Sequence, residues 1–448
     1  YDKVSFDDRE KFTEEHMDQL HDSVLNPLEG NMWWLDADSP WQALAVMMEI
    51  RDVMSWCKNQ GLPHNEFLSG MPVHQDGSCN GLQHYAALGR DLNGAAAVNL
   101  IATEDGVPAD VYSRILGVVV DQIATDSELH TIPGGMYGCA LPGPDHPKGP
   151  YGVDKAECEG QTENGRGYAS MLKEAQESFE NDVSARQMRN KLARVLNGHV
   201  DRKMVKQTVM TSVYGVTRRG ARDQVQRRIV DKIDAGLMTE IVEPVGDKHN
   251  PSENLQFKAA DYVAALTLDS IGTVFNEAQS IMDWLAAMAA EIGNQGEAVQ
   301  WMTPIGFPVI QPYRKYTSKQ MQTCMQHVVL AHDSASFPVD KKRQKTAFPP
   351  NFVHSLDATH MLMTAKTCDE QQVDFAAVHD SYWTQAGTVD QMNEILRNEF
   401  VNLYTQSNVL EDFAESAALL YPGVDMPPLP ARGKLDLNVV KTSPFFFS

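Results

Sequence analysis

Residues 72–84 read PVHQDGSCNGLQH, and this stretch decides how the chain is interpreted. It predicts a short strand, then a turn, then a helix, with the carboxylate of Asp76 at the end of the strand. Strand ends in mixed α/β folds are where ligands and catalytic groups gather. Because small residues follow Asp76 at once, this carboxylate is suited to hold a hydrated Mg²⁺ against a phosphate. An aspartate that only caps a turn is the alternative at this point.

A basic segment further along the chain is the second candidate site. Arg202, Lys206, Met210 and Tyr214 recur every four residues, so on a helix they form one slowly winding ridge. Two cations one turn apart can clamp a polyphosphate, and an aromatic ring two turns further on can stack a base or contact a sugar. The alternative is a helix packed through its apolar side chains, with both cations in water.

Residues 373–386 predict a β-hairpin whose tip carries His379, Asp380 and Ser381. Such a tip can present Asp380 toward a neighbouring strand end, although an ordinary Asp-Ser turn is the simpler interpretation. The three tip residues cannot themselves form a hydrolase triad, because neighbours on an extended chain point to opposite faces. Two separated carboxylates, a cationic ridge and a nearby aromatic are the parts that phosphoryl transfer needs, since its catalysis is mostly positioning and charge neutralisation.

Charge is distributed unevenly along the chain. The formal net charge is −22 over 448 residues, which taken globally argues against nucleic-acid binding. Between Arg186 and Arg228, however, twelve Lys and Arg residues stand against two acids. This basic island predicts a local anion-binding surface, and a solvated helix with charges on its outer face is the alternative.

Size and composition limit the class of protein. The chain is 42% hydrophobic, which is ample for a large core and predicts about three domains. No apolar run approaches 18 residues, so we expect no membrane span. The six cysteines form no CxxC pair and are expected to be reduced thiols.

The remaining pattern predicts several further elements. Helices are expected at 108–126, 169–232, 255–292 and 351–369, and a strand pair at 301–313 with a turn at Pro304-Ile305-Gly306. The Gly- and Pro-rich residues 130–168 predict a surface loop. The basic run 341–345 is interpreted as an exposed loop, a phosphate contact or a nuclear address.

Three ordered motifs give the chain a resemblance to a known family. Asp76-Gly77-Ser78 with Gly81-Leu82-Gln83-His84, then Arg202-x3-Lys206-x7-Tyr214-Gly215, then His379-Asp380-Ser381, resemble motifs A, B and C of phage-type single-subunit RNA polymerases. The blocks 76–91, 206–211 and 348–357 and the ending Phe445-Phe446-Phe447-Ser448 look like the mitochondrial members. The resemblance runs from about residue 30 to the end of the chain.

The resemblance implies an α+β fold that is mainly helical, a right-hand polymerase palm and fingers with a small antiparallel palm sheet. Its expected boundaries are a helical lead-in at 1–30, a first part of the palm at 31–105, fingers at 106–350, and the rest of the palm with the tail at 351–448. Within the fingers we expect a motif B helix at about 200–215 and a specificity-hairpin-like segment at 307–345. The C-terminal phenylalanines are expected near the catalytic centre.

The resemblance also implies roles for individual residues. Asp76 and Asp380 would hold two Mg²⁺ ions, and Gly77 would offer its carbonyl to a metal. Arg202 and Lys206 would contact the β- and γ-phosphates, with Lys206 a proton donor to the pyrophosphate. The expected nucleotide-binding residues are Arg202, Lys206, Met210, Tyr214, Gly215 and His354, of which Tyr214 and His354 would sense the ribose 2′-hydroxyl. His379, Ser381 and Gly81 would support the site.

Two positions favour ribonucleotides over deoxyribonucleotides. Related DNA polymerases share motif B, but they carry a Glu five residues after the first catalytic Asp, where Gly81 stands here and leaves room for a ribose. Their third motif ends His-Asp-Glu, whereas this one ends His379-Asp380-Ser381.

The expected activity is therefore that of a mitochondrial DNA-directed RNA polymerase, a nucleotidyltransferase of transcription that adds NTPs to an RNA 3′-end and releases pyrophosphate. The DNA template, nascent RNA, NTPs and initiation factors are the expected partners, and a plastid is the alternative location. A nucleic-acid-binding fragment without full activity and a related DNA polymerase remain the alternative functions.

Overall fold

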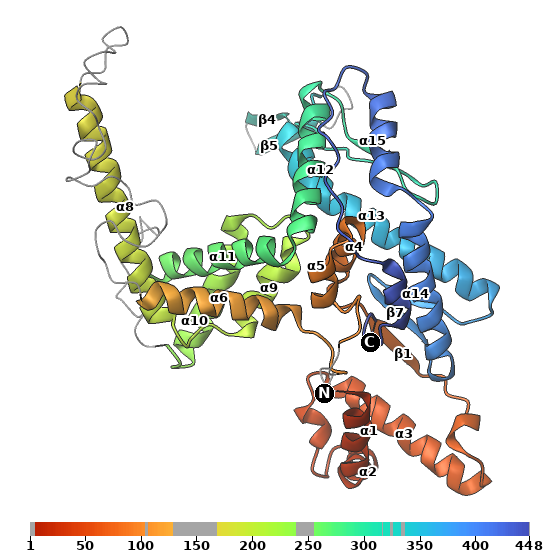
Figure 1. Cartoon of the computed structure of the whole chain (residues 1–448). Coiled ribbons are helices and arrows are strands. Elements are labelled where there is room, and N and C mark those ends of the chain that lie inside the picture. Colours follow the sequence, from red (N-terminus) through yellow and green to blue (C-terminus); the bar gives the residue numbers. More distant parts are fainter. Residues whose placement is uncertain are drawn as a thin grey trace. The chain divides into compact units, whose positions relative to one another are not determined.

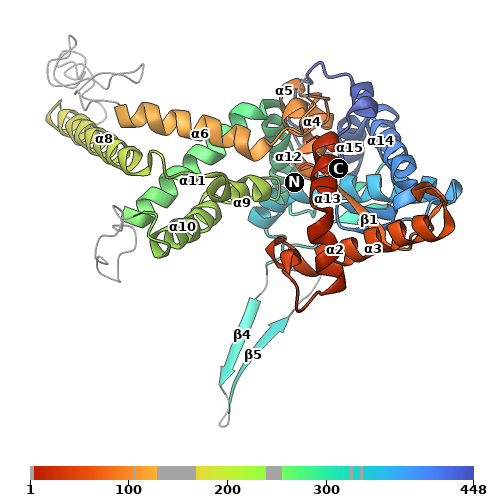
Figure 2. The ribbon, with the colours of Figure 1, turned by 90° about the horizontal axis from the view of Figure 1, so that it is seen from below.

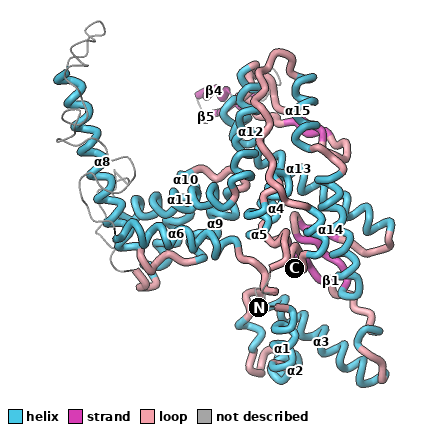
Figure 3. Tube along the Cα trace, viewed as in Figure 1, coloured by secondary structure: helices cyan, strands magenta, loops and turns pink. Residues whose placement is uncertain are grey.

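The computed structural model describes residues 5–103, 106–128, 168–238, 255–315, 317–322, 326–332 and 337–447. Over these residues the chain is mainly helical with small antiparallel sheets (Figures 1 and 3), which confirms the expected fold class. The predicted loop at 130–168 lies, except for its last residue, outside the described part of the chain.

The chain forms two compact units, each assembled from separated segments. Unit 1 comprises Tyr1–Val111, Val213–Gly215 and Val274–Ser448, and unit 2 comprises Tyr112–Ser212 and Val216–Thr273. The segment 213–215 therefore belongs to unit 1 although the residues on both sides of it belong to unit 2.

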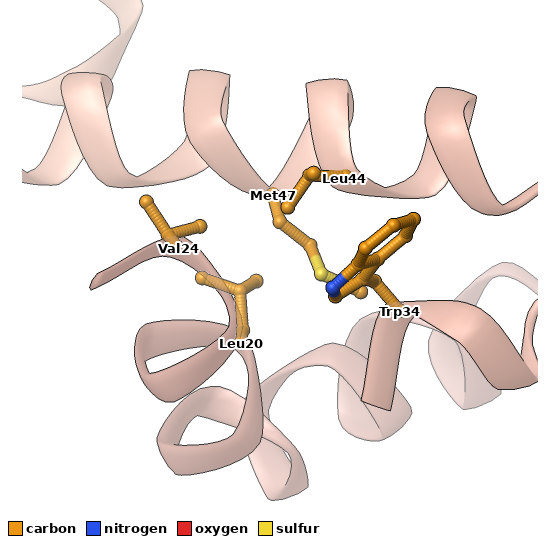
Figure 4. Close-up of a cluster of buried hydrophobic side chains, with 5 residues drawn as sticks. All are labelled: Leu20, Val24, Trp34, Leu44 and Met47. Carbon is orange, nitrogen blue, oxygen red and sulfur yellow. The ribbon is translucent and has the colours of Figure 1, made fainter. Parts of the chain in front are cut away.

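Unit 1 begins with a helical segment that has its own small core. It contains α1 (Phe6–Glu15), α2 (Met17–Leu25), the 3₁₀ helix η1 (Trp33–Asp36), α3 (Pro40–Gln60) and η2 (His64–Glu66). Proline at the first position of α3 needs no amide partner there, and Gly61 at φ 68° ends the helix. Figure 4 shows the buried side chains of this core, which are Leu20, Val24, Trp34, Leu44 and Met47.

Unit 1 also contains a three-stranded antiparallel sheet, whose first strand follows this helical segment in the sequence. Its order is β1–β7–β6, with β1 at Pro72–Asp76, β6 at Ala376–Val378 and β7 at Ser381–Gln385. Two helices follow β1, namely α4 (Asn80–Gly89) and α5 (Leu92–Ala97). The predicted strand–turn–helix at 72–84 and the predicted hairpin at 373–386 are therefore both confirmed.

Two further hairpins belong to unit 1. Strands β2 (Gln300–Met302) and β3 (Pro308–Ile310) confirm the strand pair predicted for 301–313. Strands β4 (Thr317–Gln322) and β5 (His327–His332) pair with each other as a two-stranded ribbon (Figure 2) within the predicted specificity-hairpin-like segment.

Long helices complete unit 1. These are α12 (Asn276–Asn294), α13 (Lys341–Glu370), α14 (Val389–Thr405), α15 (Val409–Leu420) and the 3₁₀ helices η6 (Ala386–Thr388) and η7 (Leu437–Thr442). Helices α12 and α13 pack side by side (Figure 1). Phe348, Phe352, Trp301 and Phe413 pack their rings against one another beside α13, with centroids 5.1–6.0 Å apart.

Unit 2 is entirely helical in its described part. It contains α6 (Val111–Glu128), α8 (Tyr168–Leu196), α9 (Arg202–Ser212), α10 (Arg218–Asp234) and most of α11 (Leu255–Val274). A buried carboxylate joins three of these helices: Asp126 of α6 accepts from Arg189 Nε of α8 at 2.6 Å and from Tyr262 Oη of α11 at 2.5 Å.

Besides dividing the helical stretch predicted at 169–232 into α8, α9 and α10, the structure corrects two further helix boundaries. Helix α13 starts at Lys341 rather than near 351, so the basic run 341–345 is helical and not a loop. Asp340 caps this helix by accepting from Arg343 N, and Pro349 and Pro350 lie inside it. Proline costs a helix about 3 kcal/mol, but burial of Phe348 and Phe352 offsets a cost of this size.

The second correction concerns the helical stretch predicted at 255–292. It is two helices, because the fully buried Phe275 takes a non-helical conformation between α11 and α12. Among the helices that the structure describes, none is long and apolar enough to cross a membrane.

Candidate active site

The two predicted metal-binding carboxylates lie at neighbouring strand ends of the sheet in unit 1. Strand β1 ends at Asp76, and the register places Asp76 opposite Ser381, the first residue of β7. Asp380 directly precedes Ser381. Pairing of β1 with β7 thus brings together two carboxylates that are about 300 residues apart in the sequence.

A two-residue turn fixes the backbone at Asp380. Val378 pairs with Ser381, so His379 and Asp380 form the turn between β6 and β7. His379 has a φ of 57°, a conformation that costs a non-glycine residue about 1 kcal/mol. The neighbouring β1–β7 and β6–β7 pairing holds this strained turn in place, which gives Asp380 a defined position.

The C-terminal tail lies against the end of β1. Gly77 forms an isolated antiparallel bridge with Phe447. From α4, Gln83 donates through Nε2 to the carbonyl oxygen of Phe446 at 2.9 Å. The residue after Asp76 is therefore held between α4 and the tail, so the C-terminal phenylalanines lie beside the end of β1.

A buried arginine, which the sequence interpretation did not single out, anchors this tail. Arg397 of α14 donates through Nε to Ser443 O at 2.9 Å and through Nη2 to Pro444 O at 3.1 Å. Its Nη1 donates to Asn393 O at 2.8 Å. Burial lowers the pKa of Arg397 from its ordinary value, but an arginine stays charged at any physiological pH. One guanidinium thus orders the segment that leads to Phe447.

The sequence analysis also did not predict a polar network between α4 and α13. Asn80, the first residue of α4, donates through Nδ2 to Asp357 Oδ1 of α13 at 2.5 Å, and His84 Nε2 lies 3.7 Å from the same oxygen. Burial raises the pKa of Asp357, but the adjacent His84 and the hydrogen bond from Asn80 bring it below its ordinary value. Asn80 and Asp357 are 277 positions apart, so no local pattern signals the pair.

Tyr214 and His354, the two predicted ribose sensors, contact each other within unit 1. Their rings are 4.7 Å apart in an edge-to-face arrangement. Burial, and then the charges of Asp380, of the thiolate that Cys79 forms at high pH and of Asp357, raise the pKa of Tyr214, so its hydroxyl keeps its proton at neutral pH. Burial lowers the pKa of His354 despite the opposing charges of Asp357 and Asp380.

Gly81 has a packing reason to be glycine. A Cβ at this position would overlap Cγ1 of Val213 and come within 3.2 Å of the Val213 Cβ. Any larger residue at position 81 would therefore push the 213–215 segment away from α4. The suggestion that Gly81 leaves room for a ribose remains a prediction, and close approach of Val213 is an independent reason for the same residue.

The predicted phosphate clamp lies on α9 of unit 2. Arg202 is the first residue of this helix, and Lys206 follows one turn later. The ring of Tyr112, from α6 of the same unit, lies 4.9 Å from Arg202 Cζ and 5.7 Å from Lys206 Nζ. Met210 continues the ridge one turn further on, as the four-residue spacing predicts. Its side chain is 44% exposed.

The ridge does not extend as regular helix to Tyr214, because α9 ends at Ser212. Gly215 has a φ of 71°, and Val216 N donates to Thr211 O at 3.1 Å. These are the features of a Schellman motif, in which a left-handed residue closes the helix. Tyr214 thus lies in the closing turn, which corrects the expected placement of Tyr214 and Gly215 on the helix itself.

The donor set suits Mg²⁺ held partly by substrate. Among the described residues, no group of three or more His, Cys, Asp or Glu side chains could hold a metal on its own. Asp76 and Asp380 supply two carboxylates, and Gly77 lies next to the first. Mg²⁺ is commonly bound by one or two carboxylates together with substrate phosphates and water, so these residues fit the predicted ions.

Comparison with known proteins identifies the family. Residues 1–424 match the profile of the DNA-dependent RNA polymerase family, and the chain belongs to this family.

Three curated relatives align with essentially the whole chain. DNA-directed RNA polymerase 2, chloroplastic/mitochondrial, of Arabidopsis thaliana is 42% identical over 447 residues, which cover 100% of this chain and 36% of the relative. DNA-directed RNA polymerase 1, mitochondrial, of Nicotiana sylvestris is 42% identical, with 37% of the relative covered. DNA-directed RNA polymerase 3, chloroplastic, of the same plant is also 42% identical, with 38% covered. The chain thus spans little more than a third of the length of the curated relatives it matches.

Proposed function

We propose that the chain is the catalytic portion of a DNA-directed RNA polymerase, which adds NTPs to an RNA 3′-end on a DNA template and releases pyrophosphate. The pairing of β1 with β7, which sets Asp76 beside the turn that carries Asp380, is the observation that supports this best. In this proposal residues 31–105 and 351–448 form the palm, and residues 106–350 form the fingers.

Asp76, Asp380 and the carbonyl of Gly77 would hold two Mg²⁺ ions. When bound, these ions lower the pKa of the attacking 3′-hydroxyl and neutralise charge on the phosphates. Arg202 and Lys206 bind the β- and γ-phosphates, and Lys206 gives a proton to the departing pyrophosphate. Tyr214 and His354 contact the ribose 2′-hydroxyl. Gly215, the residue after Tyr214, closes helix α9, and Met210 lies beside the nucleotide.

The family and its named relatives support a proposal for the partners and the location. We propose DNA template, nascent RNA and NTPs as the ligands, with separate initiation factors at promoters. The relatives carry mitochondrial and chloroplastic names, which supports an organellar transcription enzyme, with the mitochondrion as our first choice and the plastid as the second.

Primer extension tests this proposal. An RNA primer annealed to a DNA template is offered Mg²⁺ with either NTPs or dNTPs. We expect extension with NTPs, and a loss of at least about a thousandfold in Asp76→Asn and in Asp380→Asn, because each change removes several kcal/mol of charge stabilisation. The exposed Asp374, which precedes β6 in the same hairpin, provides the matched control Asp374→Asn, for which no loss is expected.

Each other outcome identifies an alternative. Equal use of dNTPs would reject ribonucleotide specificity and favour a DNA polymerase. Measurable binding of the scaffold without any extension would favour a nucleic-acid-binding fragment without full activity.

A further inference from the structure

We propose that Tyr112 is a positioning residue for the triphosphate of the incoming nucleotide, because its ring holds Arg202 and Lys206 in place. The inference rests on the proposed function, since it concerns the same phosphates. It adds a residue that lies about 90 positions before the motif B helix in the sequence.

One aromatic ring serves both cations. Arg202 Cζ lies 4.9 Å and Lys206 Nζ lies 5.7 Å from the centroid of the Tyr112 ring. Both distances fall within the range of about 6 Å over which a cation is attracted to an aromatic face. Tyr112 lies at the start of α6 and the two cations lie in the first turns of α9. The ring therefore connects the starts of two helices of unit 2.

Lys206 differs from Arg218 and Lys232 of unit 2 in its partners. Arg218 pairs with Asp261 at 2.6 Å, and Lys232 pairs with Asp201 at 2.7 Å. Within the described part of the chain, no carboxylate forms an ion pair with Lys206, whose side chain is exposed. A neutral ring can hold such an ammonium without cancelling its charge, which leaves that charge for an external anion.

The physical benefit is pre-organisation. Lys and Arg side chains have many rotamers, and ordering them on binding opposes affinity. Two like charges one helical turn apart also repel each other. A ring that attracts both cations offsets this repulsion and restricts the side chains before the ligand arrives, so less entropy is lost when a triphosphate binds.

Tyr112 is not one of the most deeply buried residues of α6. The most deeply buried apolar positions of α6 are Ile115, Val119 and Ile123, whose side chains are at most 1% exposed. Tyr112 is only partly buried and lies at the start of the helix. The ring is therefore partly accessible, and its contacts include the two cations of α9.

The test measures KM for NTP in primer extension. Tyr112→Leu removes the ring and is expected to raise KM about tenfold, the change that two exposed cation–π contacts account for, with a smaller change in kcat. Tyr112→Phe keeps the ring and should retain the KM of the unmodified chain. Arg114→Leu, at an exposed position two residues along the same helix, is the matched control and should leave KM unchanged.

A double-mutant cycle separates positioning from a general structural effect. In an Arg202→Gln background only the Lys206 contact remains, so adding Tyr112→Leu should raise KM by about threefold instead of tenfold. The same factor in both backgrounds would show that Tyr112 acts on the fold and would overturn the proposal. A KM in Tyr112→Leu equal to that of the unmodified chain would overturn it as well.

Binding of inorganic tripolyphosphate, measured by calorimetry on the full chain, needs no catalysis. We expect Tyr112→Leu to weaken this binding about tenfold and Tyr112→Phe to preserve it. If primer extension fails in every protein but this pattern appears, the proposed function falls and the role of Tyr112 stands. If extension works and tripolyphosphate binds all three proteins equally, the role of Tyr112 falls alone. Absence of tripolyphosphate binding in the unmodified chain would also overturn it.

Discussion

The rings of Tyr214 and His354 contact each other, with their centroids 4.7 Å apart, near the charge of Asp380. Because burial, and then the nearby carboxylates of Asp380 and Asp357, raise the pKa of Tyr214, its hydroxyl is a protonated hydrogen-bond donor over the whole neutral pH range. In the proposed role of Tyr214, a protonated phenol can hydrogen-bond to a ribose 2′-hydroxyl, so the hydroxyl, and not the ring, would be the group that discriminates.

Tyr214→Phe should therefore relax sugar discrimination without stopping extension. The ratio of kcat/KM for NTP to that for dNTP is expected to fall about tenfold, the value of one hydrogen bond of about 1.4 kcal/mol. Tyr421→Phe is the control, because Tyr421 donates its hydroxyl proton to Ala298 O elsewhere in unit 1. An unchanged ratio in Tyr214→Phe would remove Tyr214 from this role.

His360 makes a second prediction at the scale of single residues. Its Nε2 lies 2.8 Å from Leu396 O, so this nitrogen carries the proton, and Nδ1 accepts from Tyr382 Oη at 3.3 Å. Burial, and then the neighbouring His84, lower the pKa of His360 from 6.5 to about 4. The folded chain therefore excludes a proton that the unfolded chain binds between these two pH values.

The free energy of unfolding should accordingly be highest above pH 6.5 and fall as the pH drops toward 4. The shift corresponds to a loss of about 3 kcal/mol. Urea unfolding at pH 7 and pH 4.5 measures it, and His360→Gln, which can still donate to Leu396 O but does not titrate, should flatten the dependence. The exposed His21 gives the control His21→Gln; if that variant flattens the curve as much, His360 is not the cause.

At the scale of elements, unit 2 is joined by a buried carboxylate on α6. Asp126 is 1% exposed and accepts from Arg189 of α8 and Tyr262 of α11. A single side chain thus connects three helices that come from distant parts of the sequence. Because the Arg189 side chain is 41% exposed, water can partly replace Asp126, so the pair is worth less than a fully buried one.

Asp126→Ala should lower the free energy of unfolding of unit 2 by about 2 kcal/mol, because it leaves Tyr262 and Arg189 without their acceptor. Chemical denaturation followed by circular dichroism measures the change. The exposed Asp121 lies on the same helix, and Asp121→Ala should change stability by less than about 0.5 kcal/mol. Equal losses in the two variants would contradict the special role of Asp126.

The sequence predicted elements best where a local pattern has one physical meaning. The strand–turn–helix at 72–84 and the hairpin at 373–386 follow from alternation and turn residues, and both are confirmed. The start of α13 was misplaced because Pro349 and Pro350 normally interrupt a helix, whereas burial of their apolar neighbours keeps them inside this one.

Contacts between distant segments could not be predicted. Asn80 meets Asp357, Arg397 meets Ser443, and Tyr112 meets two cations of α9. Each pair depends on which elements pack together, and nothing in the local periodicity encodes that. The catalytic candidates were found because each lies in a short motif of neighbouring residues, while the residues that hold them in place were not.

At the scale of the whole molecule, the charge is strongly acidic but its basic part is concentrated in unit 2. Arg219 and Arg227 on α10 are exposed, and in the described residues neither forms an ion pair, whereas Arg218 is bound to Asp261. Non-specific DNA binding depends mainly on such free cations and weakens with salt.

Replacement of Arg219 and Arg227 by Gln should therefore reduce the slope of log K against log salt for DNA binding by up to about 2. Fluorescence anisotropy of a labelled duplex across a salt series measures the slope. Arg218→Gln is the control and should change the slope less, because its charge is already paired. An undiminished slope in the double variant would place the DNA elsewhere.

The pairing of β1 with β7 also affects the order in which parts of the chain can fold during synthesis. About 300 residues separate Asp76 from Ser381, and at 5–20 residues per second the ribosome needs roughly 15–60 s to cover that distance. During this interval β1 has no partner strand, and an unpaired strand edge is prone to aggregate. The helices of unit 2 are completed within the same interval and can fold first. The β1–β7–β6 sheet is thus among the last parts to form, and a chaperone that shields β1 until Ser381 emerges would raise the yield of folded protein.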